Sequence, residues 1–394
     1  MKIIKALDRL EELKKAKIFV DEGGFHTTPF ASMPKLTREF GGGFIPGKMY
    51  AITADTAGGK TKFIKSLLFA MWSNYKRGIG KNYKVVFFAL EESYQEFMDS
   101  VFITFYEIHY EKQILEGLLP SINYPMLNSL FKTTLPDIVF ECLLKIADYV
   151  QDFMDKIILS DISNPTGMYK FCKQVVEEQG YGTHVYEETK MRDGTTKQIY
   201  SGIERKDYDT QYIVMVDHMS ALKAEQSKND NKHTTMEKWV ANYCKTIITE
   251  KWGWTSVDIL QQMFDPDRSA SFNQKNEVVI RRVEPSLDKL GNNKEIARYY
   301  YVIIGLFNPY YYHIKEYPRT NSYDITIFED NFRCAIILKN RYGLPGKKVP
   351  FYFYGNSFYW KEMPPVLIDN EPNIKLAELV DKHLQLTKIK SIHV

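Results

Sequence analysis

The sequence predicts an α/β protein whose central, mostly parallel sheet is covered by helices on both faces. Short apolar segments, expected to be strands, recur along the chain at 49–53, 85–90, 157–159, 212–216 and 257–260. They are largely apolar instead of alternating regularly with polar residues, which is typical of strands buried on both faces. Helical patterns separate most of them, and this alternation favours parallel pairing.

Size and composition set limits on the kind of protein. A chain of 394 residues has room for one large α/β domain with attachments or for two modest domains. The net charge of +3 excludes a polycation, so any nucleic-acid binding requires a local basic surface. The four cysteines are far apart and form no CxxC pair, and no apolar run approaches the ~20 residues that span a bilayer. We therefore predict a protein of the reducing cytoplasm with no membrane partner.

The ends of the chain differ from its middle. Residues 1–17 are expected to form an amphipathic helix with an apolar stripe of Ile3, Leu7, Leu10 and Leu13. This helix either caps its own domain or docks on a neighbouring subunit. The predicted organisation is a linker helix and irregular segment over 1–40, a main domain over 41–362, and a C-terminal tail with a helix over 363–394.

Helices and a hairpin are expected between the strands. A helix follows residues 54–61, a second begins near Tyr94, and helical patterns cover 126–155 and 167–178. A polar insertion at 183–208 contains Arg-Asp-Gly, which is a hairpin turn signal. Another amphipathic helix starts at Met236. Aromatic, β-rich segments at 299–307, 324–328, 334–339 and 349–360 are expected to add C-terminal β-hairpins.

The loop after the first expected strand has the composition of a phosphate-binding site. Residues 54–61 read ADTAGGKT, which matches the Walker A pattern except that Ala54 replaces its first glycine. Backbone N–H groups at the start of a helix attract anions, and glycines let the phosphates approach closely. Lysine would reach the β- and γ-phosphates, and threonine would ligate Mg²⁺. We predict that ATP and Mg²⁺ are bound by Ala57, Gly58, Gly59, Lys60 and Thr61.

Two further strand ends carry carboxylates. The strand 212–216 leads into Asp217, the Walker B form, and this carboxylate is the second predicted Mg²⁺ ligand. A turn residue is the alternative interpretation of Asp217. Glu91 and Glu92 end the strand after the Walker A helix. Glu91 is the candidate base for the water that attacks the γ-phosphate, whereas Glu92 is better explained as a helix N-terminal acid.

The order of the motifs resembles that of the RecA-like motor domain of DnaB-family replicative helicases. The matching segments cover roughly 36–360 and read, in order, GGFIPGK, ADTAGGKT, FFALEES, IVMVDH, DILQQM, PSLDKLGNNKEIARYYYVII and LKNRYGLPGK. The resemblance implies a RecA-like P-loop NTPase fold and an ATP-hydrolysing enzyme.

The resemblance also implies roles for individual residues. Glu91 matches the catalytic glutamate, and Gln262 matches the glutamine that senses the γ-phosphate. Lys339 and Arg341 match the cationic pair that a neighbouring subunit inserts at the nucleotide. Such cations would stabilise charge in the transition state. Without the resemblance, these two residues are simply the basic end of a strand.

Two polar loops correspond to the DNA-contacting loops of these helicases, at 223–235 and 263–277. Their candidate phosphate contacts are Lys228, Lys232, Arg268 and Lys275. Because both loops also contain acidic residues, plain surface loops remain an alternative. The N-terminal helix corresponds to the linker helix that packs on the adjacent subunit.

Some features depart from the pattern of the family. The acidic pair of its IEQDAD stretch is lost around Ile296, and His218 replaces a residue that is often Tyr. The insertions at 126–150 and 183–208 are larger than usual. The first forty residues are too few for the helical domain that binds primase and loader. These features suggest a phage-type or otherwise diverged member.

The leading prediction is an ATP-dependent DNA helicase that acts during replication as a hexameric ring on single-stranded DNA. Its expected partners are single-stranded DNA, further copies of this chain, and a primase or loader, in a bacterial or phage-infected bacterial cytoplasm. One alternative is a RecA-like ATPase for recombination or protein assembly without helicase activity. Another is a P-loop scaffold that keeps the fold and has lost the chemistry.

Overall fold

A computed structural model describes most of the chain, and the description that follows is confined to it. The described residues are 6–55, 58–130, 133–191, 193–225, 231–262, 278–319 and 322–364. No helix in these ranges is both long and apolar enough to cross a membrane. The four cysteines are all free and buried.

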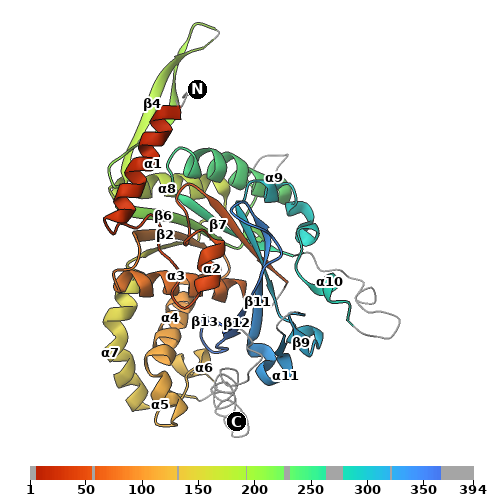
Figure 1. The fold of residues 1–394 in the computed structure, drawn as a ribbon. Helices are drawn as coiled ribbons and strands as arrows, with labels where there is room; N and C mark the ends of the chain where they lie inside the picture. Colours follow the sequence, from red (N-terminus) through yellow and green to blue (C-terminus); the bar gives the residue numbers. More distant parts are fainter. Residues whose placement is uncertain are drawn as a thin grey trace.

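A nine-stranded sheet forms the centre of the molecule (Figure 1). Its order is β13 (Trp360–Glu362), β12 (Lys348–Phe353), β11 (Phe332–Asn340), β8 (Val302–Phe307), β1 (Met49–Ala54), β7 (Thr255–Gln261), β6 (Thr210–Asp217), β2 (Asn82–Ala89) and β3 (Ile157–Ser160). Pairing is parallel from β8 to β3 and antiparallel from β8 to β13. The predicted α/β class and mostly parallel sheet are therefore confirmed.

Helices cover both faces of this sheet. The helices of the described chain are α1 (Ala6–Asp21), α2 (Pro34–Glu39), α3 (Lys60–Lys76), α4 (Tyr94–His109), α5 (Glu111–Leu115), α6 (Tyr124–Leu127), α7 (Asp137–Met154), α8 (Pro165–Glu178), α9 (Lys232–Glu237), a π-helix (Lys238–Thr249) that continues α9, α10 (Ile280–Val283) and α11 (Ile325–Phe328). Helix α1 is exposed along almost all of its length and does not cover the sheet. Successive residues of one strand serve opposite faces. Val85 and Phe87 pack with α3, α4 and α7, whereas Val86 and Phe88 pack with α8 and the π-helix.

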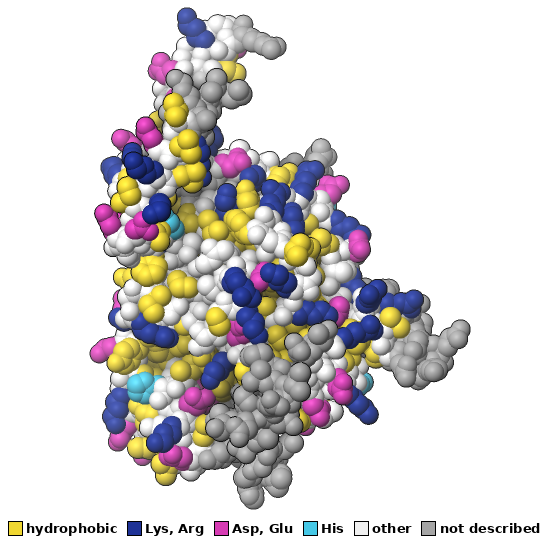
Figure 2. Space-filling view, in the orientation of Figure 1, with side chains coloured by type: hydrophobic (Ala, Val, Ile, Leu, Met, Phe, Trp, Pro, Cys, Tyr) yellow, Lys and Arg dark blue, Asp and Glu magenta, His cyan; other side chains and the backbone are white. Residues whose placement is uncertain are grey.

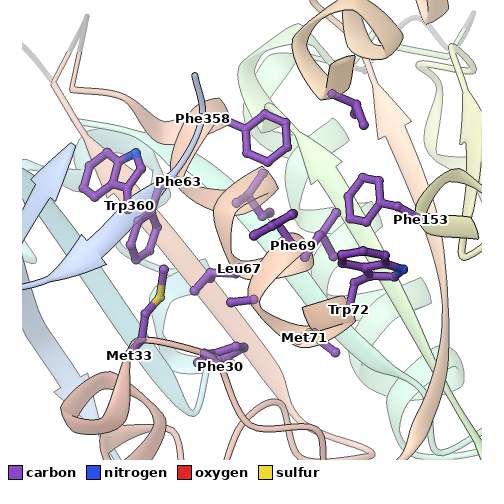
Figure 3. Packing of buried hydrophobic residues seen from close by; sticks show 14 of the residues in the cluster. Phe30, Met33, Phe63, Leu67, Phe69, Met71, Trp72, Phe153, Phe358 and Trp360 are labelled. Atoms are coloured by element: carbon purple, nitrogen blue, oxygen red, sulfur yellow. The ribbon is translucent and has the colours of Figure 1, made fainter. Parts of the chain in front are cut away.

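Aromatic packing holds α3 beneath the sheet (Figure 3). The Phe63 ring lies 4.8 Å from that of Trp360, which belongs to the last described strand. Farther along the helix, Phe69 and Trp72 pack around Phe105. Helix α3 is thereby fixed by residues far away in the sequence, and so is the loop that leads into it.

The insertion 183–208 forms a long hairpin that projects from the body (Figure 1). Its strands are β4 (Gly182–Lys190) and β5 (Thr196–Arg205), so the predicted hairpin turn is confirmed. Charged and apolar side chains are exposed on this arm (Figure 2), including Tyr186 and Ile199. At its base, the Tyr200 hydroxyl accepts a hydrogen bond from the Trp252 indole N–H.

Three sequence-based expectations were wrong in detail. The segment 18–40 is not wholly irregular, because it contains α2 and buries Leu36 and Phe40 in the core. Residues 325–328 form helix α11 instead of a strand, because the Asp324 carboxylate accepts the Thr326 N–H at the helix start. The N-terminal helix extends to Asp21. Of its apolar stripe, Ile3 lies outside the described residues, and the other three are exposed, Leu7 72%, Leu10 60% and Leu13 48%.

Candidate nucleotide-binding site

The loop between β1 and α3 needs glycine at two described positions. Gly59 precedes the first residue of α3 with a φ of +83°, in the left-handed region. A Cβ at Gly59 would lie 2.9 Å from Cζ2 of Trp360, and one at Gly58 would lie 2.5 Å from Cβ of Ala54. The loop thus packs closely against Ala54 at the end of β1 and against Trp360 of β13. Ala57 lies outside the described residues.

Lys60 is the first residue of α3, and its side chain turns back over the loop. Its Nζ donates to the carbonyl oxygens of Ala54 at 3.3 Å and Asp55 at 3.1 Å. Burial lowers the pKa of Lys60, while the carboxylates of Asp217, Asp55 and Glu91 raise it. Three acidic groups therefore surround the ammonium that is predicted to bind phosphate.

Asp217 ends β6 beside the end of β2, where it pairs in register with Ala89. It is 2% exposed, and the Thr61 hydroxyl donates a hydrogen bond to its carboxylate. Burial raises the pKa of Asp217 to about 6, and the nearby Glu92 and Glu91 contribute to the rise. Within the described part of the chain, its Oδ1 has no hydrogen-bond partner. The two predicted metal ligands are thus brought together, with one buried oxygen still unsatisfied.

The two glutamates after β2 have different surroundings. Glu91 is half-exposed, and its charge raises the pKa of both Lys60 and Asp217. Glu92 is mostly buried, and its Oε2 lies 2.6 Å from Nζ of Lys65, a lysine only 3% exposed. Glu92 is therefore not the helix N-terminal acid. That position belongs to Glu96, which forms a capping box with Ser93 at the start of α4.

Gln262 follows the end of β7 and is buried. Its Nε2 donates to Oγ1 of Thr53 at 3.1 Å and to the carbonyl oxygen of Ser286 at 3.3 Å. Its Oε1 accepts the N–H of Ser286 at 3.4 Å. The side chain thereby joins β1, just before the phosphate loop, to backbone that follows segment 263–277.

Lys339 and Arg341 lie near the amino-terminal ends of the parallel strands, whereas Lys60 lies beyond the carboxyl end of β1. Strand β11 runs antiparallel to β8, so that Asn340 pairs with Val302, which in turn pairs with Tyr50 near the start of β1. Roughly 13 Å of strand separates that level from Ala54, at ~3.3 Å per residue. The two cations and the phosphate loop of one chain therefore do not meet.

Backbone carbonyls and an aromatic ring hold these two cations. Nζ of Lys339 donates to the carbonyl oxygen of Ala297 at 2.8 Å, and Nη2 of Arg341 donates to that of Arg298 at 2.9 Å. The Arg341 guanidinium lies 4.9 Å from the centre of the Tyr301 ring. Burial and the neighbouring Arg341 lower the pKa of Lys339 to about 8.

The candidate DNA-contacting residues are largely outside the described structure. Lys228, Arg268 and Lys275 belong to undescribed segments, and Lys232 is described only through its backbone at the start of α9. Their predicted contacts with DNA stay predictions.

Sequence reasoning missed several residues that contact the site. Tyr312 donates its hydroxyl hydrogen to Asp55 at 2.8 Å, and Nε2 of His218 lies 2.7 Å from Oε1 of Glu91. Lys65 and Trp360 were missed as well. Only His218 carried a local signal, since it directly follows the Walker B aspartate. The other residues come from helix interiors or distant segments that carry no motif.

Comparison with known proteins identifies the fold. No protein-family model and no curated protein sequence matches the chain. Among solved structures, the ATPase domain of a phage helicase is similar with a TM-score of 0.59 and 14% identity, over 90% of this chain and 98% of that one. A DnaB-like replicative helicase, described with its interactions with primase, is similar with a TM-score of 0.60 and 15% identity, over 92% of this chain and 69% of that one. The chain therefore has the RecA-like fold of DnaB-like helicase ATPase domains.

Proposed function

We propose that this chain is the motor of an ATP-dependent DNA helicase of the DnaB-like class. It translocates on single-stranded DNA during replication, as a hexameric ring that hydrolyses ATP between subunits. One observation carries the proposal. The phosphate loop, Asp217 and Glu91 lie together at the carboxyl ends of the parallel strands, and the cations Lys339 and Arg341 lie near the opposite, amino-terminal ends. In a ring, Lys339 and Arg341 of one subunit can face the phosphate loop of the next.

The phosphate loop supplies the binding half of the site. Gly58 and Gly59 let backbone approach the phosphates, and the start of α3 attracts negative charge. Lys60 exchanges its bonds to Ala54 and Asp55 for bonds to the β- and γ-phosphates. Burial of Lys60 strengthens that attraction, because the surroundings screen charge less than water does.

The metal ligands fit Mg²⁺. This ion prefers oxygen ligands and is commonly held by one or two side chains together with phosphates and water. The Thr61 hydroxyl and the Asp217 carboxylate are in contact. The buried Oδ1 of Asp217, which has no hydrogen-bond partner among the described residues, is available to bind Mg²⁺ or one of its water molecules. When bound, Mg²⁺ neutralises charge on the β- and γ-phosphates.

Hydrolysis then needs a base and a stabiliser of developing charge. Glu91 is exposed enough to orient a water molecule and near enough to Lys60 to face the γ-phosphate. Lys339 and Arg341 of a neighbouring subunit stabilise the transition state, so ATP turnover depends on subunit contact. Gln262 links the phosphate loop to the segment 263–277, which makes it the route by which nucleotide state reaches DNA.

Mixed rings test the shared site. Lys60→Ala and Arg341→Ala variants should each lack single-stranded-DNA-stimulated ATPase activity. When the two are mixed, about a quarter of the interfaces combine an intact loop with an intact arginine by random assortment, and activity should return in proportion. Two inactive variants that stay inactive after mixing and reassembly would refute the site between subunits.

The unwinding activity needs its own test. Wild-type protein should displace a labelled strand from a forked duplex in the presence of ATP, and Lys60→Ala should not. ATP turnover without strand displacement would favour the RecA-like ATPase for recombination or protein assembly.

A further inference from the structure

The proposed base, Glu91, has no regular structure to hold it. It follows β2 in a bend, and its side chain is 52% exposed. A glutamate side chain with several rotatable bonds loses appreciable entropy when one orientation is selected. A general base must hold its carboxylate within hydrogen-bond reach of the attacking water. The site therefore needs a group that selects one orientation of Glu91.

His218 is placed to select that orientation. It follows Asp217 at the end of β6, next to β2 in the sheet, and its side chain is 14% exposed. Its Nε2 lies 2.7 Å from Oε1 of Glu91. Oγ of Ser220 lies 2.6 Å from Nδ1 and 3.3 Å from Nε2 of the same ring, and it lies 3.4 Å from Oε1 of Gln261 on β7. Side chains at the ends of the three adjacent strands β2, β6 and β7 thus lie in contact.

Proton positions follow from the chemistry of the groups. An ionised Glu91 only accepts hydrogen bonds, so Nε2 of His218 must carry a hydrogen and donate it. In the neutral ring, Nδ1 then accepts the hydroxyl hydrogen of Ser220, and because that hydroxyl carries a single hydrogen, Gln261 receives none from it. Oε2 of Glu91 stays available to accept a hydrogen bond from water.

We propose that His218 is a positioning residue that orients Glu91 toward the attacking water, with the Ser220 hydroxyl holding the imidazole through its contact with Nδ1. The inference rests on the proposed function, because it assigns a partner to the base of that reaction. It assigns no contact between His218 and the nucleotide. Loss of the imidazole should therefore slow turnover without weakening nucleotide binding.

Three substitutions separate the two ring nitrogens. His218→Leu removes both, His218→Asn keeps an amide near the place of Nδ1, and His218→Gln places an amide N–H near that of Nε2. Leu and Asn should lower kcat of the single-stranded-DNA-stimulated ATPase by on the order of 10- to 100-fold, as misplaced catalytic groups do. Gln should restore kcat to within a few-fold of wild type. KM for ATP should stay within a few-fold in all three.

Two controls exclude a merely structural role. His184 is also mostly buried, with Nδ1 3.0 Å from the Tyr200 hydroxyl and Nε2 3.1 Å from the Lys173 carbonyl oxygen, at the base of the hairpin. His184→Leu should therefore change thermal stability more than kcat. In a Glu91→Gln background, His218→Leu should cause no further loss of kcat, because both changes act through one carboxylate.

The possible outcomes distinguish this inference from the proposed function. If wild-type protein hydrolyses ATP in a Lys60-dependent way but His218→Leu keeps full kcat, only the role of His218 is overturned. A faster His218→Leu enzyme would likewise overturn it, because His218 would then restrain Glu91. If wild-type protein shows no Lys60-dependent hydrolysis at all, the proposed function fails first.

Discussion

Replacing Asp217 by Asn should stabilise the fold while it removes function. The pKa of Asp217 rises from 3.8 to about 6, chiefly because the carboxylate is buried. The folded protein therefore holds this proton more tightly than the unfolded chain does. The resulting loss in the free energy of unfolding is absent below pH ~4, grows as the pH rises toward 6, and is complete above that. It amounts to about 3 kcal/mol, at 1.36 kcal/mol per unit of pKa difference. Asn carries no charge and avoids most of this cost.

Thermal unfolding in EDTA without nucleotide measures the effect. At pH 8 the Asp217→Asn variant should melt higher than wild type by on the order of 5 °C, and the difference should shrink toward pH 4.5. Mg²⁺ with a non-hydrolysable ATP analogue should then stabilise wild type much more than the variant, whose ATPase activity should be lost. An Asp217→Asn protein that melts lower than wild type at pH 8 would refute the reasoning from burial.

Three other changes probe the loop, the cations and the hairpin. Gly59→Ala should cost about 1–2 kcal/mol for the left-handed backbone plus the clash with Trp360, and should lower Tm and nucleotide affinity. Gly78→Ala, which also has a positive φ but meets nothing within 4 Å, should cost only the backbone part. ATPase activity should fall as pH rises through about 8, because Lys339 loses its proton. The Lys339→Arg variant should keep its activity to higher pH, because arginine stays charged. A pH profile of Lys339→Arg identical to that of wild type would show that deprotonation of Lys339 is not the cause. Replacing 187–199 by Asn-Gly should leave Tm and basal ATPase activity near wild type, and a large loss of either would assign the arm a structural role.

Much of the fold was predictable because its signals are local. Apolar runs of strand length predicted β1, β2, β3, β6 and β7, and the turn within 183–208 predicted the hairpin. The segment 18–40 lacked such a signal. Phe40 is buried because its ring stacks on that of Tyr50 in β1. Such a contact between residues from different elements leaves no periodic pattern in the sequence. At 324–328, one side-chain cap outweighed the strand-forming composition.

The sequence by itself predicted the phosphate loop at 54–61, since glycines, lysine and threonine act through their immediate neighbours. It also determined that Asp217 ends a buried strand. Only the tertiary structure decided which acids and bases meet: Glu92 with Lys65, and Glu91 with His218. It alone placed Lys339 and Arg341 at the ends of the strands opposite to Lys60. The physical reason is the reversal of β11 against β8, because the direction in which a strand joins a sheet is set by long-range pairing.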